Sequence, residues 1–406
     1  MFVKVFSLIV AGVLGLVSSS PILTLPGDSL PQYDCIVVGG GPAGLTAASA
    51  LGRVRRSALL IDSADYRNGP TQEVHDVITR DGTPPAVFRY LAREQISVYK
   101  SVSMMNGTVE AIVPEENNTY FTIKLSGGTQ YESKKVILAT GLNDLLPSTP
   151  GLATGWGKGI YWCPWCDGWE HKDMPFATLC AFSEGCVKDS MTQVTLNKSP
   201  LMLTNGTYDD AHIARVEEAL PDYKERLKVN NITVDDRVLC KISRVHGNDS
   251  DYEDDFVVTF TDNSTLVLDA MRGLFPAQLK SDLPGKLGMN LTKPVDSGDP
   301  SGASVIVVKS DMQSSIPGIF AVGDTNSDGS TNVPHAMWSA KRAVVFMQTA
   351  LAMQYTDALI DEEIDSDHLK RSASGKESLM SMKRSLELPV PRYDATSNEL
   401  MDYLME

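Results

Sequence analysis

A glycine-rich turn near the start of the chain limits its fold more than any other feature. Residues 33–38 form an apolar stretch typical of a buried strand, 45–53 a small-residue helix, and 57–61 a second strand that ends at Asp62. The turn between the first strand and the helix consists of Gly39, Gly40, Gly41, Pro42, Ala43 and Gly44. Strand, glycine turn, helix, strand and acid in this order predict an α/β fold that begins with a nucleotide-binding βαβ unit.

Each part of this unit has its own role in binding a dinucleotide. Gly39 permits the tight turn, Gly41 lets a pyrophosphate approach the backbone, and Gly44 lets the helix pack against the strand. The start of the helix offers free N–H groups to the phosphates, and Asp62 can hold a ribose hydroxyl. A glycine turn without a ligand is the alternative reading. Cys35, inside the first strand, is expected to be a buried and inert thiol.

A second motif is a pair of cysteines, Cys163 and Cys166, separated by two residues. A pair at this spacing can close a small disulfide for dithiol–disulfide exchange, or it can bind a metal. Zinc requires further ligands at a suitable spacing, which Cys180 and Cys186 do not provide, so no metal site is predicted. Asp167 follows the second thiol and is a candidate carrier of its proton. A purely structural disulfide remains the alternative.

The composition excludes some classes of partner. The chain has 406 residues, enough for two domains with full cores, and a formal net charge of −15. This charge repels phosphate backbones and anionic lipid. We therefore expect neither nucleic acid nor a membrane as a main partner.

The first 19 residues have the pattern of a secretory signal peptide. Lys4 precedes an apolar run over residues 5–17, and small serine residues follow. The run is shorter than the roughly 20 residues that span a bilayer; a buried N-terminal strand or an anchor is the alternative. Outside the cell dioxygen is available, whereas reduced nicotinamide is not supplied.

Sequons for N-glycosylation support secretion independently. They all lie between residues 100 and 295, in stretches expected to form turns and strand edges. The candidate asparagines are Asn106, Asn117, Asn197, Asn205, Asn231, Asn248, Asn263 and Asn290.

Four motifs occur in a fixed order along residues 32–356. The glycine turn comes first, followed by Ala139-Thr140-Gly141, the cysteine pair with Asp167, and a strand that closes on Gly323-Asp324. In this order the chain resembles the low-molecular-weight thioredoxin reductase family. Residues 80–82, 169–171 and 332–335 are more similar to its fungal thiol oxidase branch, which includes gliotoxin-type dithiol oxidases and secreted sulfhydryl oxidases.

The resemblance implies an α/β fold of two Rossmann-like, three-layer ββα domains, the second inserted in the first, and a homodimer. The expected division is a signal peptide (1–19), an FAD-binding domain in two parts (32–147 and 276–356), an inserted domain (148–275) with the cysteine pair, and an acidic flexible tail (357–406). A short helix over 398–405 is expected within the tail. Other expected elements are helices at 85–100, 209–220 and 334–355, strands at 107–113, 120–125, 129–133, 135–141, 176–180, 304–308 and 317–324, and a pair of strands over 255–268.

The resemblance also implies FAD and assigns residues to it. Residues 40–44 would bind the diphosphate and residues 62–67 would flank the adenosine ribose. Further residues along the cofactor would be Arg67, His75, Val109, Gly141, Asp324, Asn332 and Val333. Cys163 would form the mixed disulfide with substrate, and Cys166 would face the flavin. His335 is either a base for thiols or a satisfied histidine at a helix start.

The second domain departs from the family. After the strand at 176–180 the chain has one glycine, Gly185, where a nucleotide-binding turn needs three, and Glu184 would repel a pyrophosphate. The next such loop, residues 205–210, is acidic. We therefore expect poor binding of nicotinamide nucleotides, with Cys180 and Cys186 either bridged or, like Cys240, present as thiols.

Electrons would then flow from substrate thiols through the cysteine pair and FAD to dioxygen. The expected function is a secreted FAD-dependent sulfhydryl oxidase that acts on small thiols such as glutathione. The alternatives are a dithiol oxidase that closes a disulfide within a metabolite, an NADPH-dependent reductase of the thioredoxin reductase type, and a flavin-binding protein without turnover.

Overall fold

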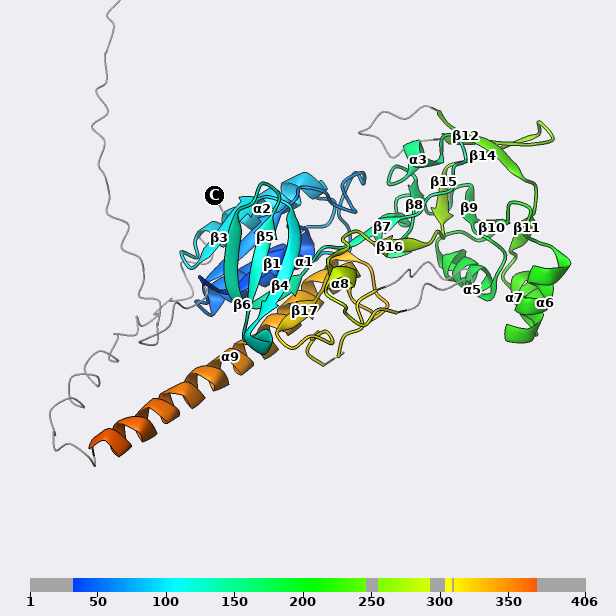
Figure 1. Ribbon diagram of the computed structural model, residues 1–406. Coiled ribbons are helices and arrows are strands. Elements are labelled where there is room, and N and C mark those ends of the chain that lie inside the picture. Colours follow the sequence, from blue (N-terminus) through cyan, green and yellow to red (C-terminus); the bar gives the residue numbers. More distant parts are fainter. Residues whose placement is uncertain (1–31, 246–254, 293–303, 309, 371–406) are drawn as a thin grey trace, which may run out of the picture. The chain divides into compact units, whose positions relative to one another are not determined.

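The computed structural model describes residues 32–245, 255–292, 304–308 and 310–370 (Figure 1). The expected signal peptide, Asn248 and the helix expected at 398–405 lie outside the described residues. The chain divides into two compact units, Met1–Gln348 and Thr349–Glu406. The elements that carry the motifs all belong to the first unit.

The first domain is built on a seven-stranded sheet. Its central strands are parallel and its far edge is an antiparallel meander. The order is β3 (Val102–Asn106), β2 (Ala58–Asp62), β1 (Tyr33–Val38), β6 (Gln130–Leu138), β5 (Tyr120–Leu125) and β4 (Val109–Glu115), with β17 (Ile319–Ala321) paired to β6. The inner strands are buried on both faces, which is why they are continuous apolar runs. The predicted α/β class is confirmed.

Helix α1 (Pro42–Arg53) follows β1 directly, and α2 (Pro85–Ser97) packs against it. Pro42 stands at the start of α1, where its missing N–H costs no hydrogen bond. A Cβ on Gly44 would lie 1.8 Å from the carbonyl oxygen of Gly39. The expected role of Gly44, close packing of helix against strand, is confirmed.

The inserted domain has a parallel five-stranded sheet and a separate antiparallel sheet of three strands. The parallel sheet has the order β11 (Thr233–Asp235), β10 (Leu201–Leu203), β9 (Phe176–Leu179), β15 (Ala270–Gly273) and β8 (Ile160–Tyr161). The antiparallel sheet consists of β12 (Leu239–Val245), β13 (Asp255–Phe260) and β14 (Thr265–Leu268). The helices of this part are α3 (Leu152–Gly155), α4 (Pro164–Asp167), α5 (Glu184–Thr192), α6 (Asp210–Ala219) and α7 (Tyr223–Val229). Apolar side chains of both sheets form one core.

Two short strands connect the domains. The chain leaves the first domain through β7 (Leu142–Asp144) and returns through β16 (Ala277–Leu279), and the two strands pair antiparallel. Helix α8 (Leu283–Lys286) follows the return strand. The inserted segment therefore begins and ends at a single two-stranded connection (Figure 1).

Some expected elements differ. Residues 129–133 and 135–141 belong largely to one strand, β6, and residues 304–308 form only isolated bridges through Val305. Helix α9 runs over Val333–Lys370 rather than ending at residue 355, so the flexible tail expected from 357 is wrong for residues 357–370. Leu359, Glu362, Glu363 and Leu369 are good helix formers, and no proline or glycine interrupts residues 357–370.

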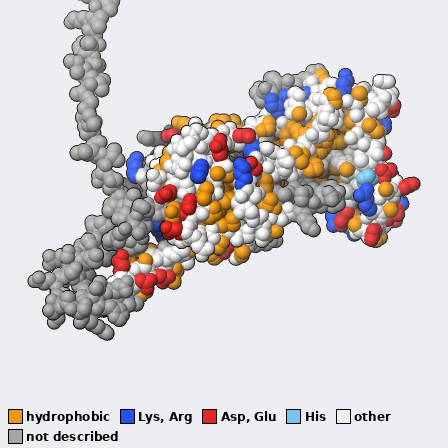
Figure 2. Space-filling model, viewed as in Figure 1, with side chains coloured by type: hydrophobic (Ala, Val, Ile, Leu, Met, Phe, Trp, Pro, Cys, Tyr) orange, Lys and Arg blue, Asp and Glu red, His pale blue; other side chains and the backbone are white. Residues whose placement is uncertain are grey.

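Figure 2 shows acidic side chains gathered on the outer half of α9. Asp361, Glu362 and Glu363 are exposed there. No helix among the described residues combines the length and the apolar character needed to cross a bilayer.

The described sequon asparagines are exposed except one. Asn117, Asn205, Asn231 and Asn263 occupy left-handed backbone positions at turns, with φ between 51° and 66°, a conformation that asparagine tolerates better than most residues. Asn197 is buried at 5% exposure, so its place among the expected glycosylation sites is contradicted. A glycan has no room on a side chain enclosed by the fold.

Candidate active site

A cavity of about 700 Å³, a size typical of cofactor sites, lies beside the glycine turn of the first domain. Gly39 to Ala43 line it, as does Asp62. A Cβ on Gly40 would lie 2.1 Å from Oδ2 of Asp62, so only glycine leaves room here. No side chain caps α1 at Gly41. The first N–H groups of this helix therefore remain for a ligand.

Asp62 lies at the end of β2 and is 1% exposed. Its Oδ1 accepts from the backbone N–H of Ala64 at 2.9 Å, and its Oδ2 accepts from the hydroxyl of Tyr66 at 2.6 Å and pairs with Arg93. A carboxylate has about four acceptor positions. These contacts fix the carboxylate and leave capacity for a ribose hydroxyl.

Arg67 lines the cavity and binds β7, the strand through which the chain leaves the first domain. Its Nη2 and Nε donate to Asp144 at 2.6 and 3.1 Å, and its Nη1 donates to Asp324 at 2.9 Å. Its guanidinium also lies over the ring of Trp162. Asp144 is the last residue of β7. Both carboxylates keep the pKa of the Arg67 guanidinium above its ordinary value although burial opposes this.

The structure brings together the residues expected along the cofactor. The cavity is lined by Arg67, His75, Val109, Gly141, Asp324, Asn332 and Val333. The expectations missed Thr71, Glu73, Trp162 and the segment 280–283, which also line it. Residues 280–283 follow the return strand β16 and carry no recognisable motif, so no signal in the sequence could have found them.

Cys163 and Cys166 form a disulfide with a Cα–Cα distance of 5.2 Å. Cys163 stands at the N-cap of α4, and Cys166 lies within it. Only Cys166 lines the cavity, as its expected position toward the flavin requires. Cys163 is 7% exposed. The neighbouring Trp165 is largely exposed, so this turn carries a large apolar side chain in solvent next to the disulfide.

Asp167 lies behind the disulfide and lines the same cavity. Burial raises the pKa of its carboxyl to about 7, because the charged form loses water. The nearby His75 and His171 oppose this shift and Glu170 adds to it. A carboxyl with a pKa near neutrality can both give and take a proton at physiological pH. The chemistry expected of Asp167 is therefore available to it.

His335 does not join this group. Its Nε2 lies 2.7 Å from Oδ2 of Asp328, and it lines a separate groove with Met312 and Trp338. Its neighbours Asn332 and Val333 line the main cavity, whereas His335 does not. This contact favours the alternative of a satisfied histidine at a helix start, and the role as a base for thiols stays a prediction.

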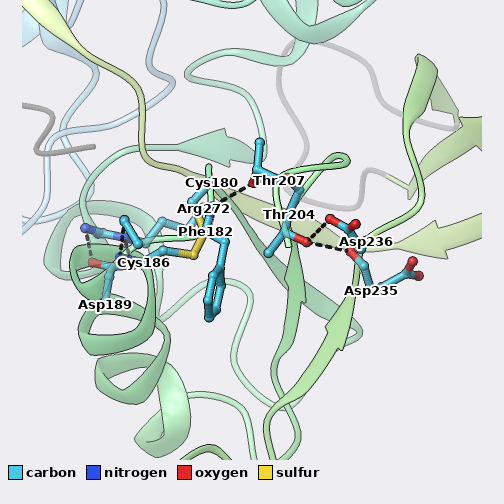
Figure 3. The surroundings of a disulfide bond; sticks show 10 residues. Cys180, Phe182, Cys186, Asp189, Thr204, Thr207, Asp235, Asp236 and Arg272 are labelled. Carbon is cyan, nitrogen blue, oxygen red and sulfur yellow. Dashed lines mark hydrogen bonds and ion pairs between the residues drawn. A yellow bond between two sulfur atoms is a disulfide. The ribbon is translucent and has the colours of Figure 1, made fainter. Parts of the chain in front are cut away.

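The corresponding turn of the inserted domain is closed (Figure 3). A disulfide joins Cys180, just after β9, to Cys186 in α5. Phe182 lies between them in sequence at 1% exposure and packs against Tyr208 and Tyr223. The sequence alone did not decide whether Cys180 and Cys186 are bridged, and the structure shows that they are. Cys35 is a buried thiol as expected, and Cys240 is an exposed thiol.

Backbone N–H groups at this turn are already occupied. The N–H of Phe182 donates to the hydroxyl of Thr207 at 2.7 Å, and the N–H of Cys186 donates to Oγ of Ser183 at 3.2 Å. Ser183 is the N-cap of α5. Side chains of the protein thus take the donors that a pyrophosphate would need.

Removal of this second disulfide tests its structural role. The double substitution of Cys180 and Cys186 by alanine is expected to lower the free energy of unfolding by about 2 kcal/mol, because the bridge closes a short loop in the unfolded chain. Chemical denaturation under non-reducing conditions measures the change. Cys240→Ser, at an exposed free thiol, is the control and should leave the midpoint unchanged. An equal midpoint for both variants would contradict a stabilising role.

Known proteins share this architecture. The family model for pyridine nucleotide-disulphide oxidoreductases matches residues 33–189. A protein of Arthroderma benhamiae described as a probable thioredoxin reductase is 39% identical, over 84% of this chain and 87% of its own. A thioredoxin reductase of Claviceps purpurea is 29% identical, over 78% and 94%. The crystal structure of an oxidoreductase from Agrobacterium tumefaciens is 24% identical, over 79% and 99%, with a TM-score of 0.67.

FAD fits the main cavity by its chemistry. The start of α1, which no side chain caps, suits a diphosphate. Gly40, which has no side chain, lets a group approach the backbone closely, and Asp62 suits a ribose. The Cys163–Cys166 disulfide meets the same cavity through Cys166. The chain is an FAD-binding oxidoreductase and belongs to the thioredoxin reductase-like family of pyridine nucleotide-disulphide oxidoreductases.

Proposed function

We propose that this protein is a thiol oxidase that converts two R–SH and O₂ to R–S–S–R and H₂O₂, with small thiols such as glutathione as substrates. The observation that carries the proposal is the closed turn after β9. In the first domain the turn has glycines and a helix start without a side-chain cap. In the inserted domain the same position holds a disulfide, a buried phenylalanine and a capped helix.

Charge at the next loop adds to this argument. Oδ1 of Asp236 accepts from the hydroxyl of Thr204 at 2.6 Å (Figure 3) and from the N–H of Tyr208 at 2.9 Å. Asp235 lies beside it at the end of β11. The loop after β10, where a dinucleotide ribose is normally recognised, is therefore bound to an acidic neighbour. The adjacent Arg237 is already paired with Asp235 at 2.5 Å, so a 2′-phosphate would have to compete with this carboxylate for it.

The residues around the first cavity would hold FAD through the glycine turn, Asp62 and Asp324. When bound, FAD supplies a two-electron acceptor for a dithiol and a donor for O₂. The protein's own part is thiol–disulfide exchange, which needs a thiolate and passes through a mixed disulfide. Cys166 faces the cavity, which leaves Cys163 for the substrate. Because Cys163 is 7% exposed, the turn that carries Trp165 must open for substrate to reach it.

Asp167 provides the acid for this exchange. When a substrate thiolate attacks the sulfur of Cys163, the sulfur of Cys166 leaves as a thiolate. The protonated carboxyl of Asp167, the next residue, can supply the proton that this sulfur takes up. The second substrate thiol then releases Cys163, and the products are one external disulfide and a reduced cysteine pair.

A reductase that uses NADPH is the competing function, since the relatives from Arthroderma benhamiae and Claviceps purpurea carry thioredoxin reductase names. Oxidation of a dithiol metabolite would use the same residues as oxidation of glutathione. We also propose secretion and a homodimer, the former from residues 1–19 and the exposed sequons.

Two assays on one preparation separate the functions. We expect oxygen uptake and H₂O₂ formation on addition of glutathione, and little oxidation of NADPH in the presence of a disulfide. A panel of monothiols and dithiols then defines the substrate class. Rapid NADPH oxidation without thiol-dependent oxygen uptake would establish the reductase instead. Recovery of the protein from culture medium, with a mass that falls on N-glycosidase treatment, tests secretion.

A further inference from the structure

His75 lines the cavity that the buried Asp167 also lines, and its imidazole lies close to three carboxylates. Its Nε2 lies 3.4 Å from Oε2 of Glu73 and 3.7 Å from Oε1 of Glu170, and its Nδ1 lies 3.5 Å from Oδ2 of Asp81. The side chain of His75 is 10% exposed, whereas that of Asp81 is 69% exposed. His75 also lines the main cavity together with Asp167. One imidazole therefore touches both the enclosed site and a carboxylate in water.

A short hairpin-like loop holds this arrangement. Val74 and Thr83 form an antiparallel bridge, with the N–H of Val74 donating to the carbonyl of Thr83 at 2.8 Å. Within the loop the N–H of Asp76 donates to Oδ1 of Asp81 at 2.8 Å. His75 and Asp81 are thus fixed on facing sides of one loop.

We propose that His75 relays protons between Asp167 and the exposed Asp81, and that it thereby keeps Asp167 supplied for exchange at Cys166. His75 acts through Asp167 and is a positioning and relay residue. The inference rests on the proposed exchange between substrate thiols and the cysteine pair, and it is independent of dioxygen as the acceptor. The gaps of 3.4 to 3.7 Å that separate the imidazole from Glu73, Asp81 and Glu170 can be closed by a small rotation or bridged by water, and the transfer from His75 to Asp167 would cross the cavity that both residues line.

Two other groups that interact with Asp167 are buried. His171 pairs with Asp269 at 2.7 Å, and both residues are buried. The hydroxyl of Tyr161 is buried among carboxylates, and burial holds the pKa of Tyr161 well above its ordinary value. Neither group offers a route to water. Glu73 and Glu170 lie 3.4 and 3.7 Å from Nε2 of His75.

A metal site is a different reading of one histidine among carboxylates. Within the described part of the chain, however, no group of His, Cys, Asp and Glu has the geometry to hold a metal ion. The three carboxylates lie at 3.4 to 3.7 Å from the imidazole. These are distances of ion pairs around a protonatable ring.

The proton balance defines what a relay would carry: a proton released by a substrate thiol to the solvent side, returned to Asp167. Each reduction of the pair consumes two R–SH and the Cys163–Cys166 disulfide, and it yields R–S–S–R and two cysteine thiols. The substrate thiols lose two protons, and the two cysteine sulfurs gain two. If Asp167 gives its proton to Cys166, it must be reprotonated before it can act again. His75 supplies this proton, and Asp81 exchanges it with water.

The test follows reduction of the cysteine pair directly. Holoprotein is mixed anaerobically with dithiothreitol over a range of pH, quenched with acid, alkylated, and the modified cysteines counted by mass spectrometry. His75→Ala is expected to slow this reduction by about 10²-fold at neutral pH, and added imidazole is expected to restore much of the rate. Because His75 lowers the pKa of Asp167, its removal should also move the pH midpoint upward.

His212→Ala is the matched control. His212 lies in α6 and also pairs with a carboxylate, Asp209, at 2.8 Å. This variant should match the wild type in rate and pH midpoint. An unchanged rate in His75→Ala, or a lost rate without imidazole rescue and without a shifted midpoint, would overturn the relay.

Asp81→Ser keeps the test valid if His75→Ala fails to fold. This exposed substitution should slow reduction at low buffer concentration, with recovery at high buffer concentration, because buffer then replaces the carboxylate as proton donor. Wild-type rates at every buffer concentration would overturn the relay. If dithiothreitol reduces the wild-type pair but glutathione does not, the proposed substrate class fails while the relay is still measured.

Discussion

Replacement of Cys166 by serine is expected to lower thiol-dependent oxygen uptake by at least about 10³-fold, as loss of an essential nucleophile or leaving group does in other enzymes. Cys166 is the one member of the disulfide that lines the cavity. Without its sulfur no electrons can pass from the substrate to that cavity. Oxygen uptake with glutathione measures the loss.

The same variant should trap the substrate. In Cys166→Ser the remaining Cys163 can still form a mixed disulfide, and no second sulfur is present to resolve it. Mass spectrometry after incubation with oxidised glutathione should show one glutathione on Cys163. Cys240→Ser, which removes an exposed free thiol, is the matched control and should retain wild-type uptake. Normal uptake in Cys166→Ser would remove the redox role of the pair.

Local motifs could be predicted because their chemistry lies within a few residues. The turn of Gly39 to Gly44 determines how α1 meets β1, and the closed pair at 163 and 166 is set by its spacing. Asp167 gains its position from the same short helix as Cys166. Such features depend little on the rest of the chain.

Features that depend on distant segments could not be predicted. Arg67 meets Asp144 across 77 positions, and His171 meets Asp269 across 98. No periodicity or motif links such pairs. His335 is a further example. The sequence predicts its position at a helix start, but the direction of its side chain depends on how α9 packs.

Asp167→Asn is expected to change the pH dependence of stability. Burial raises the pKa of this carboxyl from 3.8 to about 7, so the folded protein keeps a proton that the unfolded chain loses. The wild type is therefore most stable, with respect to this group, below about pH 4. Its free energy of unfolding should fall as pH rises to about 7, by roughly 4 kcal/mol at most, and should then stay level.

Asparagine resembles the protonated carboxyl and cannot ionise. The stability of Asp167→Asn relative to the wild type should therefore rise between pH 4 and pH 7 and stay constant above it. Urea unfolding at a series of pH values measures both proteins. Asp210→Asn, at an exposed position in α6, is the matched control, since its carboxyl is not withdrawn from water. Parallel stability curves for wild type and Asp167→Asn would contradict a buried, protonated carboxyl.

Activity should move in the opposite direction, and this contrast separates a catalytic from a structural acid. Asp167→Asn cannot give a proton to the departing sulfur of Cys166, so reduction of the pair by thiols should slow by about 10²-fold at neutral pH. The protein would then be more stable and less active at the same pH. Loss of both properties would indicate a damaged fold, and loss of neither would assign the proton to another group. A buried acid kept beside a disulfide at a cost in stability is what thiol exchange in an enclosed cavity requires, because the leaving thiolate cannot take its proton from water.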